Sequence, residues 1–304
     1  MESAWIVLRQ TAVMAILMAV GYLLFRFKKI SVEGSKSMAS LLFWVAIPSV
    51  ILNSFCIPRT AEKDQILWQS TILAVVALGL AMVVSWLVYR KKPIDEFGSA
   101  FSNAGFIGIP LVQAAYGQEM VFGIVALIAL LNILQCTWGI LVMTHKRESV
   151  APAALLKNPI IWASVLGVIL YLSGAGAYLP DVVTSAVGFS AGMNTPIAMM
   201  VLGVYLAQTN LRSMVTDPGL YGLSLLRIVV IPTLTLAVFL LLPFDTTLRM
   251  AVFVAAAAPV GANVAVYAQL HGLDYQYACK TVTLTTLLSV ILLPLMVALA
   301  GWVM

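Results

Sequence analysis

The sequence has few charged side chains, few histidines and few cysteines. Of its 304 residues, 10% are charged and 62% are hydrophobic, and there are 2 His and 3 Cys. Soluble domains are about 25% charged, so this composition excludes a water-soluble enzyme and a disordered protein. The net charge is +5, but a nucleic-acid-binding protein gathers its basic residues on one face of a soluble fold. This composition does not provide such a fold, so a nucleic-acid-binding module is excluded. The cysteines are far apart and lack CxxC spacing, which argues against a disulfide framework and against a metal site.

The sequence consists largely of long apolar runs. The mean hydropathy is +1.02, and a membrane crossing needs about 20 apolar residues. Ten runs are candidates, of which the sixth is short, and the sequence therefore predicts an all-α integral membrane protein with about ten transmembrane helices. The runs are Trp5–Phe25, Met38–Ile57, Ile66–Tyr89, Phe97–Tyr116, Met120–Met143, Ile160–Leu172, Val182–Ala207, Leu220–Leu242, Leu248–Leu270 and Tyr275–Trp302.

Lysine and arginine are distributed unevenly between the loops. Loops after odd-numbered runs hold twelve: Arg26, Lys28, Lys29, Lys36, Arg90, Lys91, Lys92, Lys146, Arg147, Lys157, Arg212 and Lys280. Loops after even-numbered runs hold three: Arg59, Lys63 and Arg249. Cytoplasmic loops retain these residues, so we predict a multi-pass protein of the cell membrane with both termini on the non-cytoplasmic side.

The ten runs divide into two halves of five, 1–144 and 159–304, joined by a short cytoplasmic connector at 145–158. An odd number of spans in each half turns the second half upside down relative to the first, as in inverted-repeat transporters. The second span of each half contains a proline, Pro48 and Pro196. The fourth span of each half is rich in Gly, Asn and Pro. We therefore predict two inverted repeats with a binding site between the two interrupted fourth spans.

The interruptions lie at 102–110 and 258–263. Proline lacks the N–H that bonds four residues back, and each glycine costs about 1 kcal/mol relative to alanine in a helix. Non-helical backbone at membrane depth survives only where it is buried in protein or lines a cavity, and its freed N–H groups favour an anion. The alternative is a pair of packing kinks. The predicted substrate-binding residues are Asn103, Gly105, Gly108, Pro110, Pro259, Gly261 and Asn263.

Other polar side chains lie within the predicted spans. Asn53, Asn194 and Thr195 belong to the second span of each half, where we expect them to face the interruptions, so they are secondary substrate-binding candidates. Asn132 and Gln135 are interpreted instead as hydrogen-bonding between helices.

Arg227 lies about seven residues into the eighth run, and intramembrane charges are usually functional. Three roles are open to it: attracting an organic anion, binding the backbone carbonyls of a broken helix, or reaching the cytoplasmic headgroups. The structural, carbonyl-binding role is favoured. No Asp or Glu lies well inside a predicted span, which favours facilitated transport over proton coupling, although backbone carbonyls with Asn and Thr can hold sodium.

Five segments, taken in order, resemble the auxin efflux carrier family, which includes plant auxin exporters and bacterial malate permeases. The resemblance extends over nearly the whole chain. The segments are Val45–Pro48, Asn103–Leu111 followed by Tyr116-Gly117, Met199–Gly203, Leu226–Pro232 and Ala258–Gly261.

This resemblance implies ten helices in two inverted repeats, with the fourth and ninth helices broken and crossing at Pro110 and Pro259. It also implies a scaffold of spans 1, 2, 6 and 7 that forms a homodimer, and a transport domain that moves as an elevator. The long central hydrophilic loop of the large plant exporters is absent, which favours a compact, prokaryotic carrier.

The sequence thus predicts a secondary transporter for a small organic anion, a malate-like or auxin-like carboxylate, with no cofactor. The alternative is a sodium- or proton-coupled symporter on the same architecture, as in the distantly related bile-acid carriers. A membrane-embedded enzyme would need a catalytic cluster that this chain lacks. A further hypothesis is a receptor that does not transport but senses a ligand in the same pocket.

Overall fold

The computed structural model describes residues 2–145, 156–209 and 211–304, and those residues are helical apart from turns, loops and one isolated bridge. Three shorter apolar helices are Ala104–Tyr116, Pro159–Leu172 and Thr246–Ala256. Seven helices in the described ranges are long and apolar enough to cross a membrane: Trp5–Arg26, Val32–Phe55, Ala61–Tyr89, Gln118–Thr144, Asp181–Gln208, Pro218–Leu240 and Tyr275–Val303. The predicted all-α membrane protein is confirmed. Most of the predicted connector at 145–158 lies outside the described residues.

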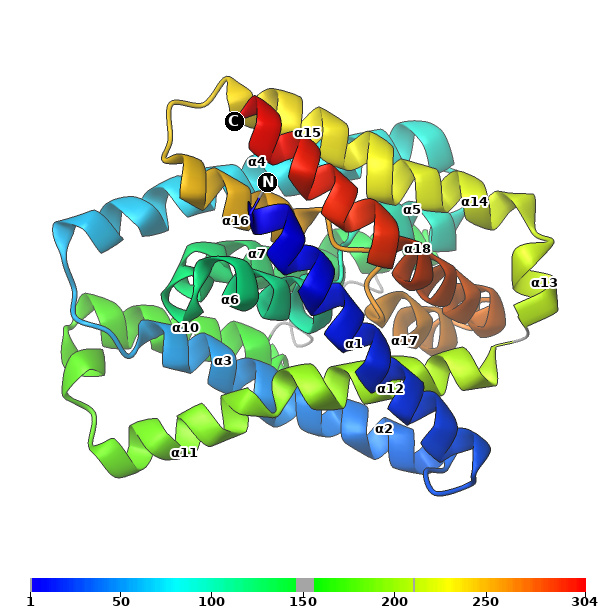
Figure 1. Cartoon of the computed structure of the whole chain (residues 1–304), viewed down its shortest axis with the longest axis horizontal. Helices are drawn as coiled ribbons and strands as arrows, with labels where there is room; N and C mark the ends of the chain where they lie inside the picture. Colours follow the sequence, from blue (N-terminus) through cyan, green and yellow to red (C-terminus); the bar gives the residue numbers. More distant parts are fainter. Residues whose placement is uncertain (1, 146–155, 210) are drawn as a thin grey trace.

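Two groups of helices line opposite edges of the molecule (Figure 1). Along one edge run α2 (Val32–Leu41), η1 (Leu42–Ala46), α3 (Ile47–Phe55), α10 (Pro159–Leu172), α11 (Asp181–Gly192) and α12 (Asn194–Gln208). Along the other run α4 (Ala61–Tyr89), α14 (Pro218–Leu225), η7 (Leu226–Val230) and α15 (Ile231–Leu240). The short helices α13 (Leu211–Val215) and η6 (Ala175–Tyr178) lie in connections.

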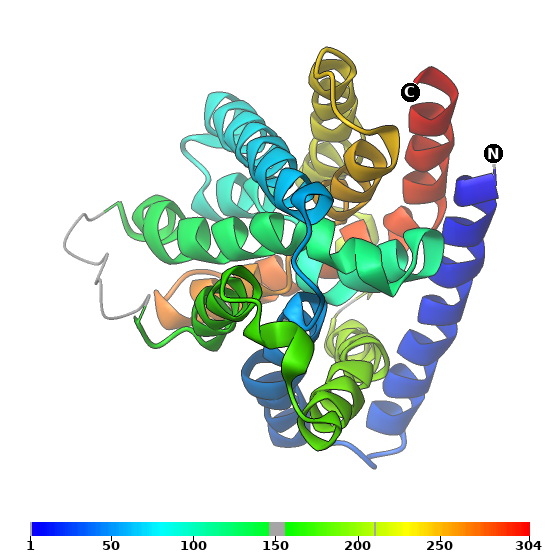
Figure 2. The same ribbon diagram turned by 90° about the vertical axis from the view of Figure 1, so that its left-hand side faces the viewer.

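The interrupted segments lie between these two groups. They are α5 (Pro93–Ala100), η2 (Ala104–Gly108) and α6 (Ile109–Tyr116) in the first case, and α16 (Thr246–Ala256) and α17 (Asn263–Leu270) in the second. The bent span formed by η3 (Gln118–Ile124), α7 (Val125–Leu134), η4 (Gln135–Gly139) and α8 (Ile140–Thr144) packs beside them. The terminal helices α1 (Glu2–Arg26) and α18 (Tyr275–Val303) contact each other, so the two chain ends lie close together (Figure 2).

Polar side chains fix where many of the helices begin. In each case a side-chain oxygen accepts a main-chain N–H of the first turn, one of the groups that has no partner inside the helix. These capping residues are Ser31, Thr60, Asn158, Asp217, Asp245 and Asp274. Two of these helices begin several residues before their apolar runs: α2 begins at Val32 rather than at Met38, and α4 begins at Ala61 rather than at Ile66.

Three of the four π-helical turns in the described residues end just before a proline: η1 before Pro48, η2 before Pro110 and η7 before Pro232. The residue preceding each proline donates its N–H to the carbonyl five residues back, as Ile109 does to Ala104. Because proline has no N–H to give, the wider turn absorbs the missing bond and the helix continues. Pro110 therefore lies inside a helix and not at a crossing, which corrects the position that the family resemblance implied.

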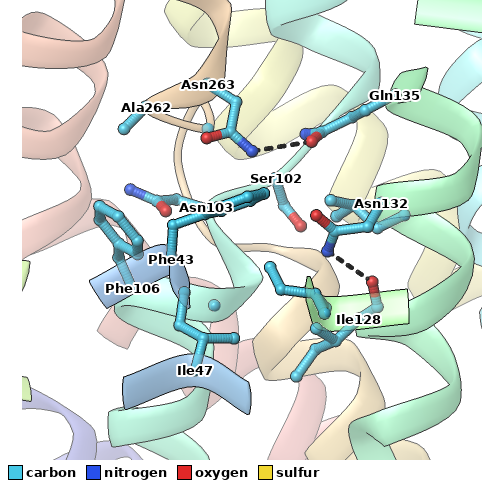
Figure 3. Close-up of a pocket in the computed structure, with 14 residues that line it drawn as sticks. Phe43, Ile47, Ser102, Asn103, Phe106, Ile128, Asn132, Gln135, Ala262 and Asn263 are labelled. Atoms are coloured by element: carbon cyan, nitrogen blue, oxygen red, sulfur yellow. Dashed lines mark hydrogen bonds between the residues drawn. The ribbon is translucent and has the colours of Figure 1, made fainter. Parts of the chain in front are cut away.

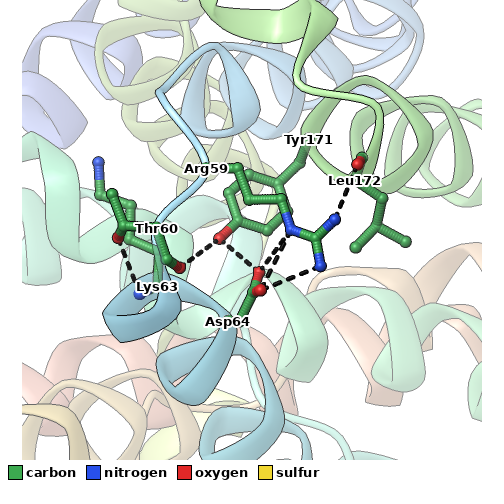
Figure 4. A network of polar contacts seen from close by, with 6 residues as sticks. All are labelled: Arg59, Thr60, Lys63, Asp64, Tyr171 and Leu172. Atoms are coloured by element: carbon green, nitrogen blue, oxygen red, sulfur yellow. Dashed lines mark hydrogen bonds and ion pairs between the residues drawn. The ribbon is translucent and has the colours of Figure 1, made fainter.

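Arg59 and Asp64 join the start of α4 to the end of α10 (Figure 4). Three Arg59–Asp64 hydrogen bonds of 3.0–3.1 Å form the ion pair, and Arg59 Nη1 donates to the Leu172 carbonyl at 3.0 Å. The Tyr171 hydroxyl donates to Asp64 Oδ1 at 2.9 Å. Hydrogen bonding to Asp64 raises the pKa of Arg59, so this pair stays ionised and ties two spans together at one end of the molecule.

Gly203 lies where α1 packs on α12, and a Cβ at this position would overlap the α1 main chain at Met18 and Tyr22. Main-chain atoms cannot move without displacing the helix, so we expect Gly203→Ala to lower the free energy of unfolding by about 1–3 kcal/mol. Thermal unfolding in detergent measures this change. Gly188→Ala on α11 is the matched control, because nothing lies within 4 Å of a Cβ there. Equal melting temperatures for the two variants would contradict the packing described.

Candidate functional site

The two interrupted segments pass each other in antiparallel contact. The Asn103 N–H donates to the Pro259 carbonyl at 2.8 Å, and the Gly261 N–H donates to the Phe101 carbonyl at 3.0 Å. Ser102 and Val260 form the isolated bridge between these bonds. The chain is non-helical here because each segment bonds to the other in place of its own preceding turn. We call this contact, residues 101–103 against 259–261, the crossing.

A buried cavity of about 30 Å³ lies against one side of the crossing. Its volume suits about two water molecules, since each needs about 10–15 Å³. Side chains from both interrupted segments, from η1 and α3, and from α7, η4 and α10 surround it (Figure 3). The lining residues are Phe43, Ile47, Ser102, Asn103, Gly105, Phe106, Ile128, Leu131, Asn132, Gln135, Ile160, Gly261, Ala262 and Asn263.

Two polar atoms of these lining residues are buried without a hydrogen-bond partner: Asn103 Nδ2 and Ser102 Oγ. Their residues are 5% and 4% exposed. Buried polar groups are nearly always hydrogen-bonded, and a donor left unpaired costs about 1–3 kcal/mol. Asn263 differs, because its Nδ2 donates to Gln135 Oε1 at 2.8 Å. The free amide N–H groups of Asn103 thus require a partner that the described protein residues do not supply.

The predicted site residues divide into two groups in the structure. Asn103, Gly105, Gly261 and Asn263 line the cavity, and Asn194 contacts it indirectly, since its Nδ2 donates to the Gly105 carbonyl at 3.1 Å. Gly108, Pro110, Pro259, Asn53 and Thr195 are not among the lining residues. Pro259 contributes its carbonyl to the crossing instead.

Sequence reasoning missed several lining residues. Ser102 precedes the predicted site by one position, and Asn132 and Gln135 were interpreted as interhelical contacts. The interpretation is wrong for Asn132, whose Nδ2 donates within its own helix to the Ile128 carbonyl at 2.8 Å, and it holds for Gln135, which accepts from Asn263 of another helix. Both nevertheless line the cavity. The signal for Gln135 in the sequence is its amide side chain within a largely apolar span.

The N-terminal and C-terminal ends of the half-helices at the crossing have different neighbours. The N-terminal ends of η2 and α17, where N–H groups lack helical partners and carry partial positive charge, adjoin the cavity through Asn103 and Asn263. The carbonyls at the C-terminal ends of α5 and α16, with partial negative charge, accept hydrogen bonds from Arg227. The cavity thus combines positive helix ends with amide donors, an arrangement suited to an anion.

Arg227 binds carbonyl groups, the favoured one of the three roles considered for it. Its Nε donates to the Ala258 carbonyl and its Nη1 to the Ser99 carbonyl, each at 3.0 Å, and its Nη2 bonds to the Ala256 carbonyl. At 1% exposure it cannot reach lipid headgroups. It therefore neutralises the negative ends of both α5 and α16.

Two acidic residues are more deeply buried than their sequence positions suggested. Asp95 and Glu96 precede the predicted span at Phe97, but α5 begins at Pro93, and both are 3% exposed. The Tyr277 hydroxyl donates to Asp95 Oδ1 at 2.8 Å. The argument against proton coupling relied on the absence of acids well inside a predicted span, and the burial of Asp95 and Glu96 in the first turn of α5 weakens it.

A bundle of apolar helices in which two helices break around a buried polar cavity is typical of secondary transporters. The family described as membrane transport protein matches this chain over residues 6–154 and 149–297. The chain therefore belongs to this family, that of the auxin efflux carriers. It is a membrane transporter and not an enzyme.

Two archaeal proteins are similar to this chain over nearly their whole length. An uncharacterized transporter of Methanothermobacter thermautotrophicus is 25% identical over 293 residues, covering 92% of this chain and 94% of the relative. An uncharacterized transporter of Methanocaldococcus jannaschii is 24% identical over 314 residues, covering 96% and 97%.

Proposed function

We propose that this protein is a secondary transporter for a small organic anion, a malate-like or auxin-like carboxylate, which binds in the cavity beside the crossing. The unpartnered amide nitrogen of Asn103 is the observation that carries this proposal. An amide N–H is a donor, and a carboxylate only accepts hydrogen bonds. No lining residue among those described is acidic, so nothing in the lining repels a negative charge.

The bound carboxylate accepts from Asn103 Nδ2 and Ser102 Oγ, while the positive helix ends stabilise its charge. Phe43, Ile47 and Phe106 supply apolar surface for its carbon skeleton. The cavity of about 30 Å³ is smaller than a four-carbon acid, so the substrate must widen it on entry. Widening of the cavity accompanies a conformational change when the residues that line it belong to two parts of the protein that move relative to each other.

We propose those two bodies on the family pattern. Residues 1–144 and 159–304 form two inverted repeats of five spans. A scaffold of α1, α2–α3, α10 and α11–α12 forms a homodimer, and the remaining spans move against it as an elevator. The cavity walls come from both bodies, since Phe43, Ile47 and Ile160 belong to the scaffold. Movement would also break the contacts of Tyr171 and Leu172 with Asp64 and Arg59.

The adjacent chain ends support an even number of crossings, which returns the chain to the side on which it began. Together with the bias of Lys and Arg, this supports a cell-membrane topology with both termini on the non-cytoplasmic side.

The test is counterflow of labelled carboxylates into proteoliposomes, with malate and indole-3-acetate in the panel. We expect Asn103→Ala to reduce the flux roughly tenfold or more, because a hydrogen bond to a charged group is worth about 1.5–3 kcal/mol. Gln113→Ala is the matched control, since this amide lies on α6 outside the cavity and bonds to Gln118. Equal flux in Asn103→Ala and in the native protein would remove the site assignment.

Coupled symport with sodium or protons on the same architecture is the second candidate, and the buried carboxyl groups of Asp95 and Glu96 are the observation that favours a coupling ion. An imposed pH gradient or an imposed sodium gradient, applied across the same proteoliposomes, separates these mechanisms from facilitated transport.

A further inference from the structure

Arg227 is a buried charge with no charged partner. The ion pair found in the described ranges is Arg59–Asp64, and the hydrogen bonds of Arg227 all go to main-chain carbonyls. Removing a cation from water is expensive unless dipoles or charges replace its hydration. Here the carbonyl dipoles do so, which means that the surroundings of Arg227 form a site for a positive charge.

The carbonyls come from both interrupted segments. Ser99 lies in the last turn of α5, Ala256 is the last residue of α16, and Ala258 lies two residues further along the chain. Carbonyls at a helix C-terminus have no partner within the helix and carry partial negative charge. In transporters with broken helices, such carbonyls hold the coupling cation. In this chain, a side chain anchored in η7 supplies the positive charge.

A second, smaller cavity of about 10 Å³ lies beside Arg227, with room for about one water molecule. Ser102 lines both this cavity and the larger one. The cavity beside Arg227 and the anion cavity therefore adjoin the same residue of the crossing, so any change in the spacing of α5 and α16 alters both.

We infer that Arg227 is a resident cation: its guanidinium fills a cation site built from the C-terminal carbonyls of α5 and α16, and it fixes these half-helices on either side of the crossing. Arg227 is thus a positioning residue that acts on the anion cavity through the main chain. Because a side chain of the protein itself occupies this cation site, a coupling metal ion cannot bind there. The inference rests on the proposed function for its consequence in transport, while the cation site is testable on its own.

The first experiment measures the cation site alone. Arg227→Ala is purified in detergent, and its Tm is recorded with millimolar guanidinium chloride, sodium chloride or choline chloride. We expect guanidinium to raise the Tm of this variant by a few degrees and to leave the native protein unchanged, because a ligand stabilises a protein only where its site is vacant. An equal shift in the native protein, or an equal shift with choline, would overturn the inference.

The second experiment measures transport. We expect Arg227→Ala to lower the maximal counterflow rate roughly tenfold or more, and guanidinium, but not sodium, to restore part of it. Native counterflow without guanidinium binding to the variant would overturn the resident cation and leave the proposed function standing. If guanidinium binds to Arg227→Ala but the native protein transports no carboxylate, the proposed function is overturned and the resident cation stands.

A further variant keeps the inference testable if Arg227→Ala does not fold. Arg227→Gln retains amide donors and much of the side-chain volume but lacks the charge. We expect it to have a lower Tm and a lower counterflow rate than the native protein. Native values of both in Arg227→Gln would show that hydrogen bonding alone suffices, and would overturn the claim that the site requires a cation.

Discussion

Substituting Asn103 by aspartate is expected to abolish uptake of the carboxylate near neutral pH. The two side chains have almost the same shape, so Asn103→Asp replaces the amide donor that faces the cavity by a negatively charged acceptor and changes little else. Two negative charges about 4 Å apart repel by roughly 4 kcal/mol at an effective dielectric constant of about 20. That energy corresponds to a loss of affinity of about 1000-fold. Initial rates of uptake into proteoliposomes, measured over a range of substrate concentrations, report this loss as a rise in KM.

The pH dependence of this variant has a definite sign. The introduced carboxyl group repels the substrate when it is ionised, above its pKa, and does not repel it when protonated. Lowering the pH should therefore restore uptake by Asn103→Asp. Gln113→Glu adds the same charge on α6 outside the cavity and should transport normally. Native uptake by Asn103→Asp at neutral pH would mean that the solute in the cavity is not an anion.

The membrane spans could be predicted from the sequence because the thickness of the bilayer fixes the length of an apolar run. Their ends could not, because the first turns of the helices are polar. The run at Phe97 marks where apolar residues begin, but α5 begins at Pro93, and Asp95 and Glu96 are buried by packing against other helices rather than by their own hydrophobicity. A one-dimensional pattern does not contain those contacts.

The crossing was predictable for a related reason. Glycine, asparagine and proline weaken a helix wherever they occur, so Asn103, Gly105 and Gly261 indicated the interruptions. The predicted break at Pro110 is wrong, because a π-helical turn accommodates a proline when the residue before it bonds to the carbonyl five positions back. Gln135 comes from a span that is not interrupted although it contains Gly123, Asn132 and Gly139, and the packing of η4 against the crossing brings it to the cavity.

The second large effect is expected from valine at position 261. A Cβ on Gly261 would lie 3.1 Å from the Ser102 carbonyl oxygen and 3.4 Å from that of Phe101. Both oxygens belong to the main chain of the opposing segment, so they cannot rotate away. Valine adds two methyl groups beyond that Cβ. We therefore expect Gly261→Val to separate the segments and to break the bonds from Asn103 to Pro259 and from Gly261 to Phe101.

The expected loss of stability is roughly 2–6 kcal/mol, from two hydrogen bonds at about 0.5–1.5 kcal/mol each and overpacking at about 1–3 kcal/mol. Thermal unfolding in detergent and carboxylate counterflow should both show the damage. Gly79→Val on α4 is the matched control, because nothing lies within 4 Å of a Cβ at that position. If Gly261→Val melts and transports as Gly79→Val does, the two main chains are not in contact, and neither the cavity nor the placement of its amide donors can be as described.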